Sequence, residues 1–136
     1  MFLDLLETKE QEKFLELAYF VANYNDDFAE EQKQLINEYR KEMLLTEDEY
    51  QIKGKEEKNI IKDFSKYEED KKKMIYIETI SLLLSDNKFD KKEKEIAEYI
   101  KNEFNLSQSF YDKAFTWVKD MFDLYNRVDD LVYGEI

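Results

Sequence analysis

The sequence predicts a single all-α helical bundle, because its composition, its helix-capping signals and an internal repeat all favour helices. The 136 residues include no proline and two glycines, whereas compact β proteins usually need both residue types in their turns. Hydrophobic residues make up 43% and charged residues 40% of the chain, which is the balance of a globular protein. We therefore expect one compact domain over residues 1–136, with about six to seven helices.

Capping boxes mark most of the expected helix starts. In a capping box, a hydroxyl or Asp side chain accepts a hydrogen bond from a backbone amide, and a Glu or Gln three residues later answers it. The boxes pair Thr8 with Gln11, Thr46 with Glu49, Ser65 with Glu68, and Asp90 with Glu93, and Ser107 begins the last helix. The helix from Ser65 is expected to run to Leu84, and Gly54 is expected to end the short helix that begins at Thr46.

Apolar residues at helical spacing indicate which faces of these helices are buried. The first helix and the helix after Asp90 each carry one stripe, and the segment 55–64 is expected to form an extra helix between the two halves. The inward residues are Phe14, Leu17, Ala18 and Val21; Ile60, Ile61 and Phe64; and Ile96, Ile100 and Phe104.

The last helix has the most regular apolar pattern of the chain. Its main stripe alternates steps of four and three residues, and a second stripe beside it widens the apolar face beyond a coiled-coil seam. The two stripes are Phe110, Ala114, Trp117, Met121, Leu124, Val128 and Leu131, and Phe115, Val118, Phe122 and Tyr125. This width predicts a central core helix. The alternative is that its end, from Leu124 to Val132, docks a protein partner or a second copy as a homodimer.

A shift of 61 positions lays the second half of the sequence onto the first. It aligns segment 25–28 with segment 86–89, and it also recovers a helix face and the next helix start. The further pairs are Lys33 with Lys94, Leu35 with Ile96, Tyr39 with Ile100, Leu45 with Leu106, Thr46 with Ser107 and Tyr50 with Tyr111. We expect pseudo-twofold repeat halves over residues 8–54 and 65–132, each built as helix, acidic turn, helix, loop and helix.

Charge and missing residue types exclude several classes of function. The formal charge of −12 disfavours phosphate backbones, so we expect no nucleic-acid partner. Without cysteine or histidine, the chain has no disulfides, thiol nucleophiles, Cys/His zinc sites or imidazole acid–base groups. Phosphate-loop and nucleophile-elbow motifs are also missing, so we expect a non-catalytic protein. No signal-peptide pattern or apolar run long enough to span a membrane occurs, so we expect a cytoplasmic protein.

The acidic turn between the helices ending at Leu84 and starting after Asp90 can be interpreted in two ways. As structure, Asp86 ends one helix, Asn87 takes a left-handed conformation, and Asp90 with Glu93 caps the next helix. As a binding site, Asp86, Asn87, Asp90 and Glu93 supply hard oxygen ligands that suit Ca²⁺, Mg²⁺ or Mn²⁺. The sequence alone leaves both interpretations open.

The first copy of this turn is more acidic but less complete. Its candidate ligands are Asp26, Glu30 and Glu31, while Ala29 replaces the N-cap Asp and Gln32 stands where the other half has Glu93. The first turn is therefore expected to be mainly structural, and any cation site is expected in the second turn.

The second half resembles the TerB-like (tellurite-resistance B) family. The resemblance lies in the pattern Ser85-Asp86-x-x-Phe89-Asp90-x-x-Glu93-Lys94 after an apolar helix end, and in the continuation Phe104-Asn105-Leu106-Ser107-x-x-Phe110. The segments 2–6 and 18–32 are similar to the start and the other copy of family members. Asp26 and Asn87 stand where the family usually has glycine.

This resemblance implies an all-α bundle with pseudo-twofold repeats, and a role in resistance to tellurite and other stresses. Family members often act beside membrane-linked or metal-related partners, and their acidic turn residues are proposed to bind divalent metal. Carried over by position, this implies Asp86, Asp90 and Glu93, and more loosely Asp26, Glu30 and Glu31. TerB-like domains also occur in proteins with other roles, including a co-chaperone.

Three hypotheses about function follow from the sequence. The first is a TerB-like accessory or stress-response protein that binds a divalent cation at the second acidic turn. The second is a metal-independent interaction scaffold, or co-chaperone-type adaptor, that docks a protein through the apolar last helix. The third is an acidic mimic of nucleic acid that occupies the groove of a basic protein.

Overall fold

The computed structural model describes residues 1–24, 29–54, 57–86 and 88–134. Within these ranges all regular elements are helices and no strand occurs, which confirms the all-α prediction. The elements are η1 (Leu3–Leu5), α1 (Thr8–Ala22), α2 (Glu30–Met43), α3 (Glu57–Phe64), α4 (Glu69–Leu84), α5 (Lys91–Glu103) and α6 (Gln108–Tyr133). The extra helix expected within 55–64 is therefore α3.

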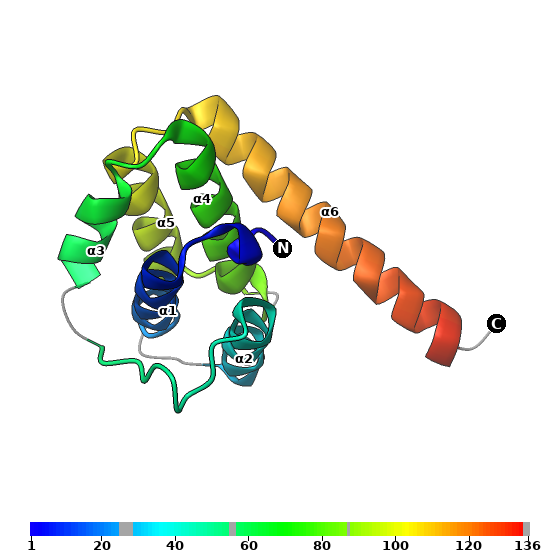
Figure 1. Cartoon of the computed structure of the whole chain (residues 1–136). Coiled ribbons are helices and arrows are strands. Elements are labelled where there is room, and N and C mark those ends of the chain that lie inside the picture. Colours follow the sequence, from blue (N-terminus) through cyan, green and yellow to red (C-terminus); the bar gives the residue numbers. More distant parts are fainter. Residues whose placement is uncertain (25–28, 55–56, 87, 135–136) are drawn as a thin grey trace.

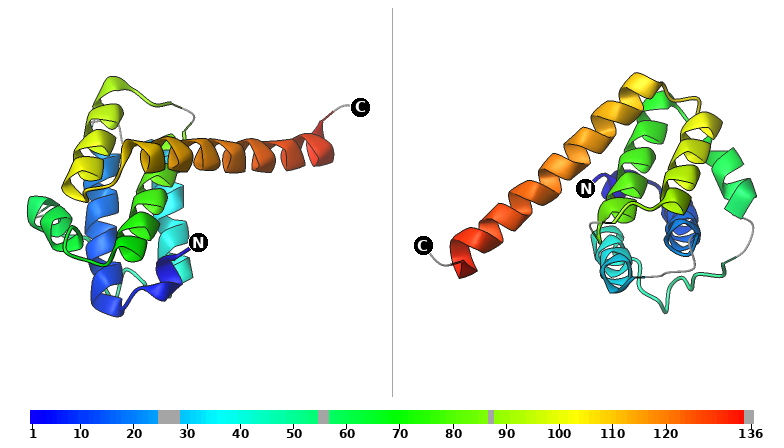
Figure 2. Two further views of the ribbon diagram at one scale, coloured as in Figure 1. Left: turned by 90° about the horizontal axis from the view of Figure 1, so that it is seen from above. Right: turned by 180° about the vertical axis from the view of Figure 1, so that it is seen from behind.

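Helices α1 to α5 form a bundle, and α6 leaves it as a long arm (Figure 1). Helix α1 contacts α2, α3 and α4, and α6 packs on α4. The core is built from side chains of all these helices, and the largest fully buried ones include Phe14, Phe64, Tyr76 and Phe104. Two further views show the second half of α6 pointing away from the other helices (Figure 2).

The offset of 61 recurs in the backbone. Helices α1 and α4 begin at Thr8 and Glu69, and helices α2 and α5 begin at Glu30 and Lys91. The bends that follow α2 and α5 also match, because Leu44 and Asn105 have positive φ angles of 53° and 54°. In both bends the next residue's N–H donates to a carbonyl five residues back, at 3.0 Å. Two helix pairs and the bends after them thus repeat as the sequence predicts.

Three of the expected helix starts differ from the structure. Helix α1 is capped through Glu7, whose N–H donates to Glu10 Oε1 at 2.8 Å. Gln11 instead is buried and its amide donates to the Leu3 carbonyl at 2.9 Å, because η1 folds back over α1. Ser65 does not start α4: its N–H bonds the Ile61 carbonyl at 2.9 Å and so closes α3.

The third difference is at Thr46. The Thr46–Glu49 box forms with reciprocal bonds of 3.3 Å, but only a single turn follows, where the second half has α6. The starts at Asp90 and Ser107 are confirmed, since Asp90 Oδ1 and Ser107 Oγ accept the N–H groups of Glu93 and Phe110.

The prediction that the last helix is a central core helix is wrong for its second half. Tyr111, Ala114 and Val118 in its first half are buried against the bundle. From Leu124 onward the apolar side chains are exposed, because α6 extends past the end of α4 and no described element packs on it there.

We predict that Leu44→Asn stabilises the protein. Leu44 is 82% exposed and has a left-handed backbone, which costs a branched side chain about 1 kcal/mol but costs asparagine less. The free energy of unfolding, measured by urea denaturation, should rise by about 0.5–1 kcal/mol. The repeat supplies the matched control, because Asn105→Leu at the equivalent bend should lower it by a similar amount. A loss of stability in Leu44→Asn would contradict this account of the bend.

Candidate functional site

The second acidic turn joins the end of α4 to the start of α5 and lies beside α6. The Ser85 hydroxyl donates to the Leu82 carbonyl at 2.7 Å, and Asp86 Oδ1 accepts the Lys88 N–H at 3.0 Å. Phe89 packs edge-on against Phe115 of α6, with ring centroids 4.8 Å apart. The turn is therefore held by hydrogen bonds of its own side chains and by an aromatic contact with α6.

Asp90 and Glu93 form the reciprocal capping box at the start of α5. The Glu93 N–H donates to Asp90 Oδ1 at 2.8 Å, and the Asp90 N–H donates to Glu93 Oε1 at 3.2 Å. Glu93 is only 1% exposed, so its carboxylate is part of the interior. This geometry provides the structural role that the sequence assigns to both residues.

The two repeats meet at this box. Gln32, the equivalent of Glu93, is also buried, and its amide donates to Glu93 Oε2 at 3.4 Å. Gln32 Oε1 accepts the Ala29 N–H at 3.2 Å, as Glu93 does for Asp90. The Glu93 carboxylate thus accepts hydrogen bonds both within its own turn and from the other repeat.

The structure places the predicted cation ligands in different surroundings. Asp86 accepts a backbone N–H, and Asp90 and Glu93 cap α5, whereas Glu30 and Glu31 are exposed in the first turn of α2. The predicted ligands Asp26 and Asn87 lie outside the described residues. Among the residues that are described, no group of three His, Cys, Asp or Glu side chains is placed to hold a metal ion. Cation binding at the turn stays a prediction.

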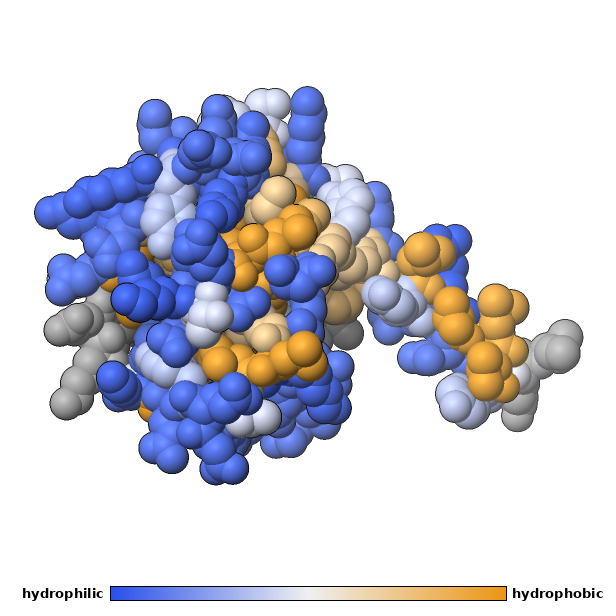
Figure 3. All heavy atoms as spheres, in the orientation of Figure 1, coloured by the Kyte–Doolittle hydropathy of each residue, from blue (hydrophilic) through white to orange (hydrophobic). Residues whose placement is uncertain are grey.

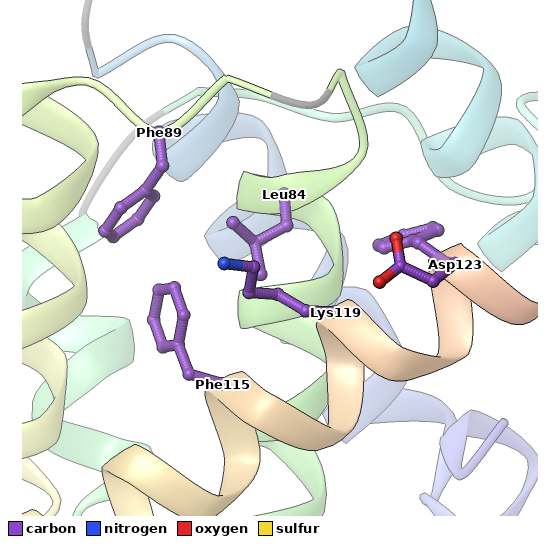
Figure 4. Close-up of a pocket in the computed structure, with 6 residues that line it drawn as sticks. Leu84, Phe89, Phe115, Lys119 and Asp123 are labelled. Carbon is purple, nitrogen blue, oxygen red and sulfur yellow. The ribbon is translucent and has the colours of Figure 1, made fainter.

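A small hollow lies beside the turn, where α6 crosses the end of α4 (Figure 4). The packed rings of Phe89 and Phe115 line one end of it, and Lys119 and Asp123 of α6 lie farther along. Its volume of about 200 Å³ is below the ~300–1,000 Å³ of typical small-molecule sites. This hollow suits a single inserted side chain better than a metabolite.

The most prominent surface feature is an exposed apolar stripe on α6. We define the α6 stripe as the residues Trp117, Met121, Leu124, Val128 and Leu131. Leu124 is 57% exposed, Val128 50% and Leu131 85%, and hydrophobic side chains gather at the projecting end of the helix (Figure 3). The exposed residues Tyr125 and Val132 lie along one edge of the stripe. The stripe continues the apolar pattern of α6 beyond the bundle that buries its first half.

Sequence reasoning missed two buried acids that hold chain segments in place. Glu16 of α1 accepts the Tyr50 hydroxyl and the N–H groups of Lys53 and Gly54, each N–H at 2.9 Å. Glu78 of α4 accepts the Phe2 N–H at 2.9 Å. The sequence feature that could have identified them is an acid within an apolar stretch of a helix. Burial, and then the bond to Glu16, raise the pKa of Tyr50 well above its usual range.

Comparisons with protein-family models, with curated proteins and with solved structures find no match for this sequence. Among the described residues, none of the helices is both long and apolar enough to cross a membrane. The function of the chain must therefore be argued from its own geometry.

We predict that the α5 cap contributes measurably to stability through its side-chain acceptor. Asp90→Ala removes that acceptor and should lower the free energy of unfolding by about 1 kcal/mol, whereas Asp90→Asn should retain most of it. Ala29 lies at the equivalent position with extended backbone angles, so Ala29→Asp should raise stability by about 0.5–1 kcal/mol. Urea denaturation with and without Ca²⁺ measures each change. A calcium-dependent gain that Asp90→Asn abolishes would instead support a cation site.

Proposed function

We propose that this chain is a non-catalytic protein-interaction module that docks a partner through the α6 stripe. The observation that carries the proposal is the exposure of regularly spaced apolar residues on a helix that has left its bundle. A helix that stays in solvent has no need of an apolar face, because polar residues would serve at every position. Contiguous exposed apolar surface of this kind is typical of protein–protein contact sites.

The energetics favour covering the stripe. Full burial of a Leu or Val side chain contributes about 1.5–3 kcal/mol, and the exposed fractions of Leu124, Val128 and Leu131 leave at least half of their surface to be buried by a partner. A docked helix would bury these residues without disturbing Tyr111, Ala114 and Val118, which hold α6 to the bundle. The module can therefore bind without refolding.

Side-chain chemistry supports a role without catalysis. Cysteine and histidine are missing from the sequence, and the buried carboxylates of Glu16, Glu78 and Glu93 cap a helix or hold backbone segments. Cation binding at the second turn would draw on the same Asp90 and Glu93 that cap α5, so we rank docking above it. The resemblance to TerB-like domains agrees with an accessory role in stress response or a co-chaperone-type adaptor, and the absence of cysteine fits a cytoplasmic location.

We predict that the stripe is needed for binding but not for folding. A triple variant, Leu124→Ser, Val128→Ser and Leu131→Ser, should abolish cross-linked capture of a partner in native extracts. Its midpoint of urea denaturation should stay close to that of the original protein, because these side chains lie outside the core.

The matched control changes three exposed polar residues on the same turns, Asp123→Ser, Asn126→Ser and Asp130→Ser, and should keep capture. Undiminished capture by the stripe variant would contradict docking through the stripe. A fall of several kcal/mol in its free energy of unfolding would show that the stripe belongs to the core.

A further inference from the structure

The α6 stripe has the spacing of a coiled-coil seam. Its members follow one another by steps of four, three, four and three residues, which places Met121 and Val128 at heptad position a and Trp117, Leu124 and Leu131 at position d. Helices with this spacing pack along the seam against one or more further helices. The partner of the stripe is therefore itself expected to be a helix with an apolar seam.

We propose that this partner is α6 of a second copy, paired antiparallel, with Asp120 of each copy facing the partner's Arg127. The inference rests on the proposed function, because it names the occupant of the same stripe. It assigns to the chain a symmetric dimer in which each arm lies along the arm of the other copy.

The charges beside the seam favour the antiparallel direction. Asp120 and Arg127 each precede an a position, so both occupy position g on the same edge of the helix. Antiparallel coiled coils place g against g, which brings Asp120 opposite the partner's Arg127 twice by symmetry. A parallel pair places g against e, and Asp120 and Arg127 would then face the partner's Tyr125 and the partner's Val132.

The same charges select the register. With Met121 layered against the partner's Leu124 and Trp117 against the partner's Val128, both g–g contacts join opposite charges. A slip of one heptad would set Arg127 against the partner's Arg127, which is a repulsive contact. One alignment therefore pairs Met121 with Leu124 and Trp117 with Val128 between the copies and also satisfies the flanking charges, and it leaves Leu131 beside the partner's Ala114.

The structure leaves these groups available for a second copy. Asp120 and Arg127 are exposed, and neither forms an ion pair within the described part of the chain. A depression of about 640 Å³ along α6 is lined by both of them together with Trp117, Met121, Asp123 and Leu124. Apolar anchors and unpaired opposite charges thus share one surface.

Whole-molecule electrostatics point the same way. Each copy carries a formal charge of −12, so two bundles side by side would repel each other. The bundle lies at the first half of α6 and the arm points away from it (Figure 2). Antiparallel arms place the two bundles at opposite ends of the pair, whereas parallel arms would place them together.

Charge exchange tests the pairing. By sedimentation equilibrium the original protein should approach twice its chain mass of 16.6 kDa. Asp120→Arg alone or Arg127→Asp alone should weaken the dimer roughly tenfold or more, because each brings like charges together on both g–g contacts. The double variant should restore the dimer, and so should an equimolar mixture of the two single variants. Asp123→Arg makes the same change of charge off the seam and should have little effect.

Cysteine cross-linking tests the direction and the register. The chain has no native cysteine, so introduced thiols report without background. A variant with both Trp117→Cys and Val128→Cys should oxidise to a covalent dimer. Either change alone should not, because the two equivalent positions of an antiparallel pair lie about 16 Å apart along the helix. Cross-linking of either single variant would show parallel arms.

The outcomes separate this inference from the proposed function. A protein that sediments as a monomer at every concentration, or a double charge variant that does not recover, overturns the antiparallel dimer. If a monomeric protein still captures another protein in a stripe-dependent way, docking stands with a different occupant. If the stripe variant still captures a partner and has the same sedimenting mass as the original protein, both proposals fail.

Discussion

A buried hydrogen bond between the Gln32 amide and the Glu93 carboxylate joins the two repeats at the positions where each caps its second helix. Gln32 and Glu93 therefore each accept a backbone N–H at the start of a helix, and they also connect the two repeats. Glu93 has almost no exposed surface, and these donors contribute to offsetting the cost of burying a carboxylate. The bond lies between the starts of α2 and α5, and α1 and α4 pack against each other and against α2.

The halves differ most in their third helix. After the bend at Leu44 the first half makes a single turn at Thr46, whereas after the equivalent bend at Asn105 the second half makes a helix of 26 residues. A bundle that buries only the first part of that helix leaves its remaining turns as an arm. The exposed stripe thus arises from unequal lengths within a duplicated frame, and not from disruption of the core.

The sequence predicts much of this frame because local signals and packing agree there. Asp90 has a capping side chain, an acid three residues later and an apolar stripe behind it, and α5 begins where expected. At Ser65 the local signal competes with the continuing turn of α3, and the tertiary contacts of Ile61 and Phe64 decide the outcome. The buried roles of Glu16 and Glu78 depend on segments far away in the chain, so no local pattern reports them.

The same limit applies to α6. An apolar stripe shows that a face is suited to burial, but periodicity does not say whether the covering surface belongs to the same chain. Ala114 and Leu131 belong to the same stripe of one helix, yet the first is buried and the second almost fully exposed. The first lies in the half of α6 that packs on the bundle, and the second lies in the arm.

Amide hydrogen exchange along α6 tests the central claim most directly. If the arm docks another helix, amides of residues 123–133 should exchange rapidly in dilute protein and become protected when the stripe is occupied, while residues 111–118 stay protected throughout. Strong protection of the arm in dilute, monomeric protein would contradict this account, because it would mean that the chain covers its own stripe.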